Sequence, residues 1–171
     1  MKFLPSPHEM KRLFILRHAK SSWDDASLSD FERPLNDVGL EAAPFMGRYM
    51  AGYGYLPKEI VSSPARRAKE TAELINANVG IGGDIRFDDR IYEASPNTLR
   101  QVASELSDDL DSALIVGHNP GIEGFIRHLT GQIEPMPTAA LAVIDLDIDS
   151  WRKIDHHTGK IVTIIRPKAV M

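Results

Sequence analysis

The sequence predicts an α/β sandwich of three layers, in which helices cover both faces of a mostly parallel, mixed sheet. Two apolar runs, residues 13–16 and 113–116, contain no polar side chain, as is typical of strands buried on both faces. Segments with helical periodicity alternate with the predicted strands, which is typical of α/β proteins. Two largely apolar runs near the end, residues 141–146 and 161–165, are joined through an expected hairpin turn at residues 156–159, which favours an antiparallel edge.

The length and charge of the chain limit its possible functions. With 171 residues it is long enough for one domain with a hydrophobic core, which we expect at residues 11–171 after a loose extension at residues 1–10. Met10 could be an alternative start. The net charge of −4 and the lack of a long basic run argue against a nucleic-acid-binding protein.

Other general features concern the cellular setting. No apolar run approaches the roughly 18 residues of a membrane span, and the apolar patch before the first prolines is too short for the core of a signal peptide. The chain has no cysteine, which excludes disulfides, thiolate catalysis and cysteine-based zinc sites. We therefore expect a cytoplasmic protein without a membrane partner.

The first predicted strand, residues 13–16, is followed by a polar loop at residues 21–30. Asn36 is a good N-cap for the next helix. Apolar side chains then recur at helical spacing, and Pro44 inside this pattern predicts a kink. The helix should end near the glycines at positions 52 and 54.

A second strand is expected at residues 59–62. Ser63 and Pro64 follow it, a capping residue and a proline suited to the first position of a helix that should continue to residue 75. The chain then passes through an expected weak strand, a loop and a helix, at residues 85–87, 90–96 and 97–106.

The clearest strand of the chain covers residues 113–117. Asn119 can cap the next helix, which Pro120 can open and which should extend to about residue 128. Prolines at positions 135 and 137 break the chain before the two closing strands.

Three predicted strands are followed by side chains suited to binding an anion. Arg17 and His18 follow the first strand, Arg67 lies in the first turn after the second, and His118 ends the clearest strand. In open α/β sheets the carboxyl ends of the strands are where ligands bind. Arginine matches phosphate oxygens with bidentate donors, and helix N-termini add backbone donors. A phosphoryl group is therefore the expected ligand.

Each of these features also has an ordinary structural interpretation. Arg17 and His18 could be a surface pair after a core strand. The basic residues around Arg67 could be the solvated face of a helix, and His118 could be a satisfied histidine at the end of a strand. Three junctions of the same kind in one chain favour the functional interpretation.

The local sequences at these junctions resemble the histidine phosphatase superfamily. They are Leu-Arg-His-Ala at 16–19, Ser-Pro-Ala-Arg-Arg-Ala-Lys-Glu-Thr-Ala at 63–72 and Val-Gly-His-Asn-Pro-Gly at 116–121. Within it, Arg-Pro-Leu at 33–35, Pro-Thr-Ala-Ala at 137–140 and the short chain are similar to the SixA-type phosphohistidine phosphatases. The resemblance covers nearly everything from residue 12 onward and implies a fold like that of phosphoglycerate mutase.

The resemblance also implies a reaction through a phosphohistidine on the enzyme. His18 matches the nucleophile. The residues that match the groups around the phosphoryl oxygens are Arg17, Arg67 and His118, of which His118 is also expected to be catalytic. The motif Ser-Pro-x-x-Arg-Ala selects Arg67 rather than Arg66.

Two positions qualify this assignment. Ala19 stands where the superfamily usually has glycine, although the nucleophile and its partners remain. Glu93 lies where members of the superfamily commonly place a proton-donating carboxylate and is expected to be catalytic, the alternative being an ordinary loop glutamate. Asp30 and Glu32 are weaker candidates for the acid.

The chemistry follows physical reasoning as well as the resemblance. A neutral imidazole can attack phosphorus, and a covalent intermediate replaces one difficult step with two easier ones. Fixed cations stabilise charge on the equatorial oxygens. We therefore expect neither a metal nor a cofactor, and we interpret His156 and His157 as turn residues rather than metal ligands.

The substrate is expected to be a phosphorylated protein. Relatives that act on small molecules usually carry inserted segments that close over the site, and the short connections here leave little sequence for a lid. We therefore expect an enzyme that removes phosphate from phosphohistidine on a phosphorelay domain. The alternatives are a phosphomonoesterase acting on a small metabolite or a phosphorylated side chain, and a non-catalytic phosphate-binding module.

Overall fold

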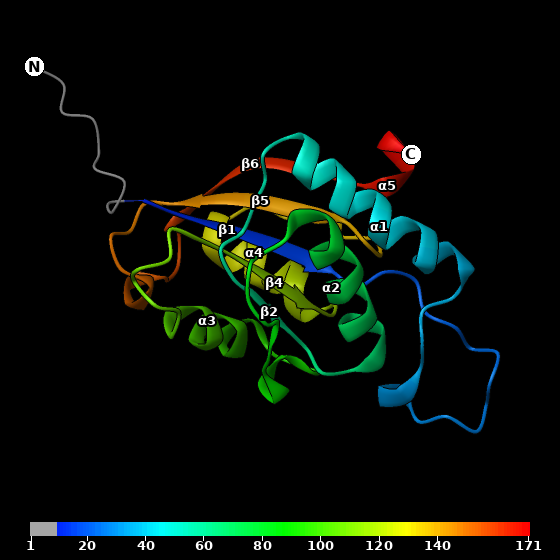
Figure 1. Cartoon of the computed structure of the whole chain (residues 1–171). Helices are drawn as coiled ribbons and strands as arrows, with labels where there is room; N and C mark the ends of the chain where they lie inside the picture. Colours follow the sequence, from blue (N-terminus) through cyan, green and yellow to red (C-terminus); the bar gives the residue numbers. More distant parts are fainter. Residues whose placement is uncertain (1–9) are drawn as a thin grey trace, which may run out of the picture.

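The computed structural model describes residues 10–171, so the expected extension at residues 1–10 lies outside the described residues except for Met10. One six-stranded sheet forms the centre of the molecule (Figure 1). Its strands are β1 (Lys11–Arg17), β2 (Ile60–Ser62), β3 (Arg86–Phe87), β4 (Ser112–Gly117), β5 (Leu141–Leu146) and β6 (Gly159–Ile165).

The sheet is mixed and mostly parallel, as the sequence predicts. The strand order is β3-β2-β4-β1-β5-β6. The pairs β2–β3, β2–β4 and β1–β4 are parallel, whereas β5 runs antiparallel to both β1 and β6. The parallel strands therefore share one carboxyl edge, which is the edge expected to hold the site.

Helices cover both faces of the sheet and complete a three-layer sandwich. They are α1 (Asp37–Gly52), α2 (Arg66–Val79), α3 (Pro96–Ser104), α4 (Gly121–Thr130) and the short α5 (Pro167–Val170). The apolar residues of α1 and α2 pack on one face, and those of α3 and α4 pack on the other. None of these helices has the length and apolar content needed to cross a membrane.

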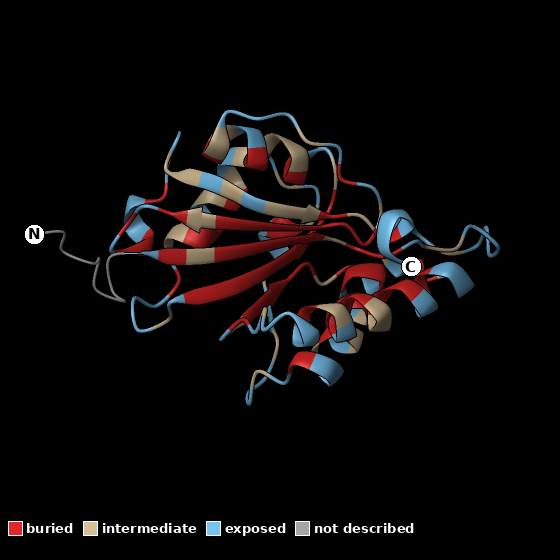
Figure 2. Cartoon of the chain, turned by 90° about the horizontal axis from the view of Figure 1, so that it is seen from above, coloured by how far each residue is buried: buried red, intermediate tan, exposed pale blue. Residues whose placement is uncertain are grey.

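The central strand β1 shows why an uninterrupted apolar run belongs here. Leu13 and Ile15 pack with α3 and α4, whereas Phe14 and Leu16 pack with α1 and α2. Successive side chains of a strand point to opposite faces, so a strand covered on both sides carries a nearly continuous apolar run. Figure 2 shows the buried residues concentrated in the strands and on the helix faces toward them.

Two helix starts differ from the prediction. Asn36 caps α1 as expected, accepting a hydrogen bond from the amide of Gly39. In contrast, α2 begins only at Arg66, after Ala65, and α4 begins at Gly121. Ser63 and Asn119 do not cap these helices, because their side chains bond with residues of the site described below.

The connection between β5 and β6 is longer than the expected hairpin turn. It includes a 3-10 turn at Trp151–Lys153, and the buried indole of Trp151 donates to the carbonyl of Leu110. His156 and His157 are exposed in the turn before β6, as predicted.

Candidate active site

The carboxyl edge of the parallel strands holds a hollow of about 560 Å³. Its lining includes four of the predicted site residues: Arg17, His18, Arg67 and His118. They come from the end of β1, the start of α2 and the end of β4. Because β1 and β2 both pair with β4, the residues that follow these strands are spatial neighbours.

The fifth predicted site residue, Glu93, lies in an adjoining hollow of about 380 Å³. The two hollows share Arg67, His118 and Asn119. Glu93 is exposed and has a backbone φ of 56°, in the left-handed region that non-glycine residues rarely adopt. Such conformations often occur at functional sites.

His18 lies on the floor of the larger hollow, with 6% of its surface exposed. Its Nδ1 is 2.7 Å from the carbonyl oxygen of Ala19. A carbonyl only accepts hydrogen bonds, so Nδ1 carries the proton and the lone pair of the neutral ring is on Nε2. Burial, followed by the charges of His118, Arg67 and Arg17, lowers the pKa of His18 to about 3 despite this bond. The ring is therefore neutral near pH 7.

The loop after His18 is attached to α2 through a threonine. The amide of Ala19 donates to Thr71 Oγ1 at 3.0 Å, and the Thr71 hydroxyl donates to the carbonyl of Arg67 at 2.7 Å. Ala19 is fully buried. The methyl group that replaces the usual glycine is thus packed in the core rather than projecting into the hollow.

Arg67 is the member of the arginine pair that faces the site. It is buried, whereas Arg66 is exposed and lies 3.8 Å from Glu70. Arg67 Nε is 3.4 Å from His18 Nε2. Its Nη1 and Nη2 donate to the carbonyl and the carboxylate of Asp30, at 2.7 and 3.1 Å.

Asp30 is the centre of a network that fixes Arg67. Its carboxylate also accepts from the hydroxyl of Tyr92 at 2.6 Å and from Arg33 at 3.0 Å. The Tyr92 bond, followed by the contacts with Arg67, lowers the pKa of Asp30 to about 2. Asp30 is therefore ionised near pH 7, which makes it unsuitable as the proton donor that the sequence left open. Glu32 lines neither hollow.

His118 stands 5.0 Å from His18, measured between ring centroids. Its Nε2 is 2.8 Å from the hydroxyl of Ser63, which explains why Ser63 is not available as a helix cap. Burial and the charge of Arg67 lower the pKa of His118 to about 4.

Buried polar atoms without a protein partner gather at this site. Among residues 10–171 there are four such atoms, and three of them belong to residues of the larger hollow: Arg17 Nε, His118 Nδ1 and Asn119 Oδ1. Unsatisfied buried polar groups are costly and call for an explanation. A bound anion would accept from the Arg17 guanidinium and from a protonated Nδ1 of His118.

The charge of the larger hollow also favours an anion. Its lining includes four cations, namely Arg17, Lys20, Arg33 and Arg67, against the single carboxylate of Asp24. Fixed guanidinium groups bind phosphate oxygens well because their donors are planar and paired. Within the described residues no three His, Asp or Glu side chains are grouped as metal ligands.

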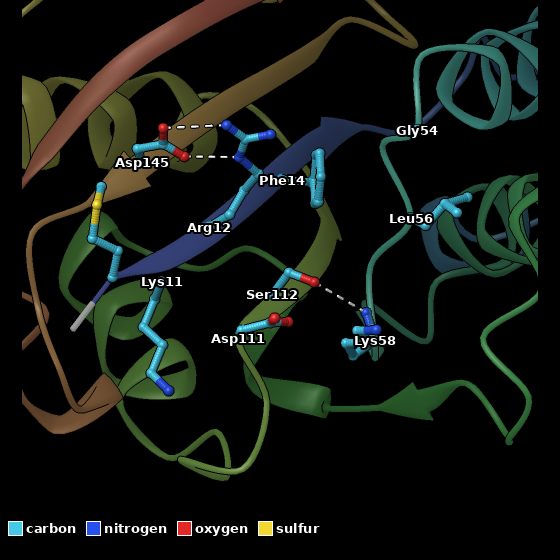
Figure 3. Close-up of a pocket in the computed structure, with 10 residues that line it drawn as sticks. Lys11, Arg12, Phe14, Gly54, Leu56, Lys58, Asp111, Ser112 and Asp145 are labelled. Atoms are coloured by element: carbon cyan, nitrogen blue, oxygen red, sulfur yellow. Dashed lines mark hydrogen bonds and ion pairs between the residues drawn. The ribbon is translucent and has the colours of Figure 1, made fainter. Parts of the chain in front are cut away.

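Another hollow, of about 520 Å³, lies at the opposite edge, near the amino ends of β1 and β4 (Figure 3). Its charges are largely paired within the protein. Arg12 contacts Asp145 at 2.7 Å, and the ammonium of Lys11 donates to two backbone carbonyls. It lacks the unpaired buried donors that distinguish the carboxyl edge.

The sequence predicts the site residues that follow strands. It does not predict the side-chain contacts between the loops around the site. Tyr92 and Asp30 are 62 positions apart, and no local pattern signals their contact. Arg33 is part of the Arg-Pro-Leu motif, but its bonds to Ser21, Ser22 and Asp30 become visible only in three dimensions.

Comparisons with known proteins agree with this geometry. The model of the histidine phosphatase superfamily (branch 1) matches residues 13–107. An uncharacterized chloroplastic protein of Arabidopsis thaliana is 32% identical over 158 residues, which cover 87% of this chain and 72% of the relative.

Solved structures with the same fold include two SixA proteins. One, assigned as phosphohistidine phosphatase SixA from Agrobacterium tumefaciens, superposes with a TM-score of 0.79 at 27% identity, covering 92% of this chain and 98% of the other. The protein histidine phosphatase SixA complexed with tungstate gives 0.82 at 21% identity, covering 94% and 99%. At 21% identity, the similarity to this second structure concerns the fold alone.

Proposed function

The chain belongs to the histidine phosphatase superfamily, and we propose that it is a phosphohistidine phosphatase that acts on a protein through a covalent intermediate on His18. The observation that carries this proposal is the state of His18. Its ring is neutral, its Nδ1 is bonded to Ala19, and its unprotonated Nε2, 3.4 Å from Arg67 Nε, faces a hollow lined by cations.

In the first step, His18 Nε2 attacks the phosphorus of the substrate. A bond forms between Nε2 and phosphorus while the bond to the leaving nitrogen breaks, and that nitrogen leaves as an imidazole that takes up a proton. Arg17 and Arg67 are placed to stabilise the charge on the phosphoryl oxygens. His118, with its unpartnered Nδ1, is the third candidate for this role.

In the second step, water attacks the phosphorus of phosphohistidine 18. The bond from phosphorus to Nε2 breaks, inorganic phosphate leaves, and the neutral imidazole returns. The hydrogen bond from Nδ1 to Ala19 keeps the ring in one orientation throughout both steps. No group other than water and the protein's own side chains is needed for this balance.

Short connections around the site support a protein substrate. Only residues 63–65 separate β2 from α2, and only residues 118–120 separate β4 from α4. The longer segment at residues 18–36 extends beyond the end of β1 (Figure 1). Such an edge leaves room for a phosphoryl group that projects from the surface of another protein, as on a phosphorelay domain.

One observation favours a second function, the hydrolysis of phosphomonoesters. Glu93 has a left-handed backbone conformation and lines the smaller hollow, which shares Arg67 and His118 with the larger one. A carboxylic acid at that place could protonate an alkoxide leaving group, which a phosphohistidine substrate does not require.

A turnover screen tests the proposal. The purified protein is assayed at one pH with a phosphohistidine-carrying phosphorelay domain and with a panel of phosphomonoesters. We expect kcat/KM to be highest for the phosphohistidine protein. A preference for an ester would support the second function, and binding of phosphate without turnover or phosphoenzyme would reveal a non-catalytic module.

A further inference from the structure

Trp23 has an unusual position for a large apolar side chain. It lies in the loop after β1, lines the same hollow as His18, and is 77% exposed. It is the most exposed of the large apolar side chains among the described residues. An exposed tryptophan does not contribute the hydrophobic stabilisation that a buried ring would provide. Its position at the site therefore calls for another explanation.

The exposed indole is nevertheless held in place. The guanidinium carbon of Arg33 lies 3.2 Å from the ring centroid, a close cation–π contact. Arg33 is 7% exposed and is fixed by bonds to the Ser22 carbonyl, the Ser21 hydroxyl and the Asp30 carboxylate. One face of Trp23 is thus covered by an anchored cation, while 77% of the residue stays exposed to solvent.

The direction of the reaction sends the leaving group toward the open side of the hollow that Trp23 also lines. In phosphoryl transfer the attacking and leaving atoms lie roughly in line with phosphorus between them. His18, at 6% exposure, is on the floor of the hollow, whereas Trp23 is at its mouth. A group that leaves opposite His18 therefore moves toward the mouth, and the other side chains that line the hollow are mostly charged or polar.

We propose that Trp23 is a specificity residue whose free indole face stacks on the planar ring that carries the phosphoryl group of the substrate. This inference rests on the proposed function, in which that ring is the imidazole of phosphohistidine. Aromatic pairs in stacked or edge-to-face arrangements gain free energy beyond their buried area, corresponding to about a 2- to 13-fold change in a rate constant. An aliphatic phosphate cannot make the same contact.

The experiment measures the two chemical steps separately. Phosphoenzyme formation is followed with phosphoimidazole and phenyl phosphate as ring-bearing donors and with glycerol 2-phosphate as an aliphatic donor. Breakdown of the phosphoenzyme is followed after removal of the donor. For Trp23→Ala, we expect the second-order rate constant of formation to fall about 2- to 13-fold with both ring-bearing donors and to stay unchanged with the aliphatic donor. Breakdown should keep its rate, because the ring has already left.

Three further variants separate stacking from support of Arg33. Trp23→Phe should retain most of the preference for ring-bearing donors, and Trp23→Leu, which still covers Arg33, should lose it. Tyr53→Ala removes another exposed aromatic ring, one that does not line the hollow, and should change neither step. Equal losses with all donors, or a slower breakdown, would overturn the inference. A wild-type protein that forms no phosphoenzyme with any donor would instead overturn the proposed function.

Discussion

The two arginines at the start of α2 have neighbouring positions in the sequence and very different surroundings. Successive helical residues point about 100° apart, so both cannot face one phosphoryl group equally. Arg67 lies 3.4 Å from His18 Nε2, whereas Arg66 is exposed on the other side. The difference between their roles can therefore be measured directly.

We expect Arg67→Ala to lower kcat/KM by on the order of 100-fold or more, because it removes a donor proposed to stabilise the transition state. Arg66→Ala is the matched control and should leave kcat/KM nearly unchanged. Steady-state kinetics with one phosphohistidine donor decides the matter. Equal losses from the two substitutions would mean that the assignment of Arg67 is wrong.

Glu93→Gln should separate two kinds of substrate. An alkoxide leaving group is strongly basic and needs a proton as the bond breaks, and a positioned acid typically contributes about 10²- to 10⁴-fold. An imidazole leaving group has a conjugate acid with a pKa of roughly 6.5 and can be protonated near neutral pH. We expect the variant to lose phosphomonoester hydrolysis and largely to retain phosphohistidine hydrolysis.

The measurement compares rates of phosphoenzyme formation for both substrates at one pH. If the glutamine variant slows formation equally with both, Glu93 is not the acid for the leaving group. If neither rate changes, Glu93 is an ordinary loop residue despite its backbone conformation.

The start of helix α1 packs closely against the loop that follows His18. Gly39, in the first turn of α1, packs against the backbone of Lys20, two residues after His18, and a methyl group there would overlap the Lys20 carbonyl oxygen. Gly121, at the start of α4, packs against the backbone of Ala94, next to Glu93, and a methyl group there would overlap the Ala94 carbonyl oxygen. The loop after His18 and the loop that contains Glu93 thus each pack closely against a glycine at the start of a helix.

We expect Gly39→Ala to destabilise the protein by about 1–3 kcal/mol, the usual cost of overpacking, and to slow phosphoenzyme formation by shifting the loop after His18. Gly52→Ala, in the same helix, is the matched control, because nothing lies within 4 Å of its added methyl group. Urea unfolding and phosphoenzyme kinetics measure the two effects. Unchanged stability and kinetics in Gly39→Ala would contradict this packing.

The sequence was sufficient to predict most of the elements and insufficient for their starts. Uninterrupted apolar runs predict β1, β4 and the three-layer arrangement, because a strand between two helix layers is apolar along most of its length. The caps expected at Ser63 and Asn119 were wrong, because these polar side chains have competing partners on other segments: His118 for Ser63, Met136 and Glu123 for Asn119. Propensity describes local preferences, and such long-range contacts override them.

For the candidate site, the sequence likewise predicts the main residues but not all of their contacts. Arg17, His18, Arg67 and His118 follow strands and helix starts, so their meeting at one edge follows from parallel topology alone. The bonds of Asp30 with Tyr92 and Arg33 depend on how two loops fold over the sheet edge, which periodicity does not describe.

The stability of the whole molecule should depend on pH through the two histidines of the site. Their pKa values in the folded state are lowered to about 3 for His18 and about 4 for His118, whereas an unfolded chain has about 6.5. Below pH 6.5 the unfolded chain therefore binds protons that the folded protein excludes. The free energy of unfolding should fall as the pH falls, by up to about 1.4 kcal/mol per pH unit for each histidine.

Urea unfolding at pH 7.5, 6 and 5 measures this dependence. His18→Asn and His118→Asn should each flatten it, and His156→Asn, which removes an exposed histidine, should not. An identical pH dependence in all four proteins would mean that the site histidines are not excluded from protonation by the fold.

The position of the covalent phosphate tests the central claim most directly. The protein is mixed with a phosphohistidine donor, quenched without acid, digested and mapped by mass spectrometry, with His18→Ala treated in parallel. We expect the phosphate on the imidazole of His18 in the wild-type protein, and neither phosphoenzyme nor turnover in a folded His18→Ala variant. Phosphate on His118, or a variant that keeps a tenth of the wild-type turnover, would contradict the account.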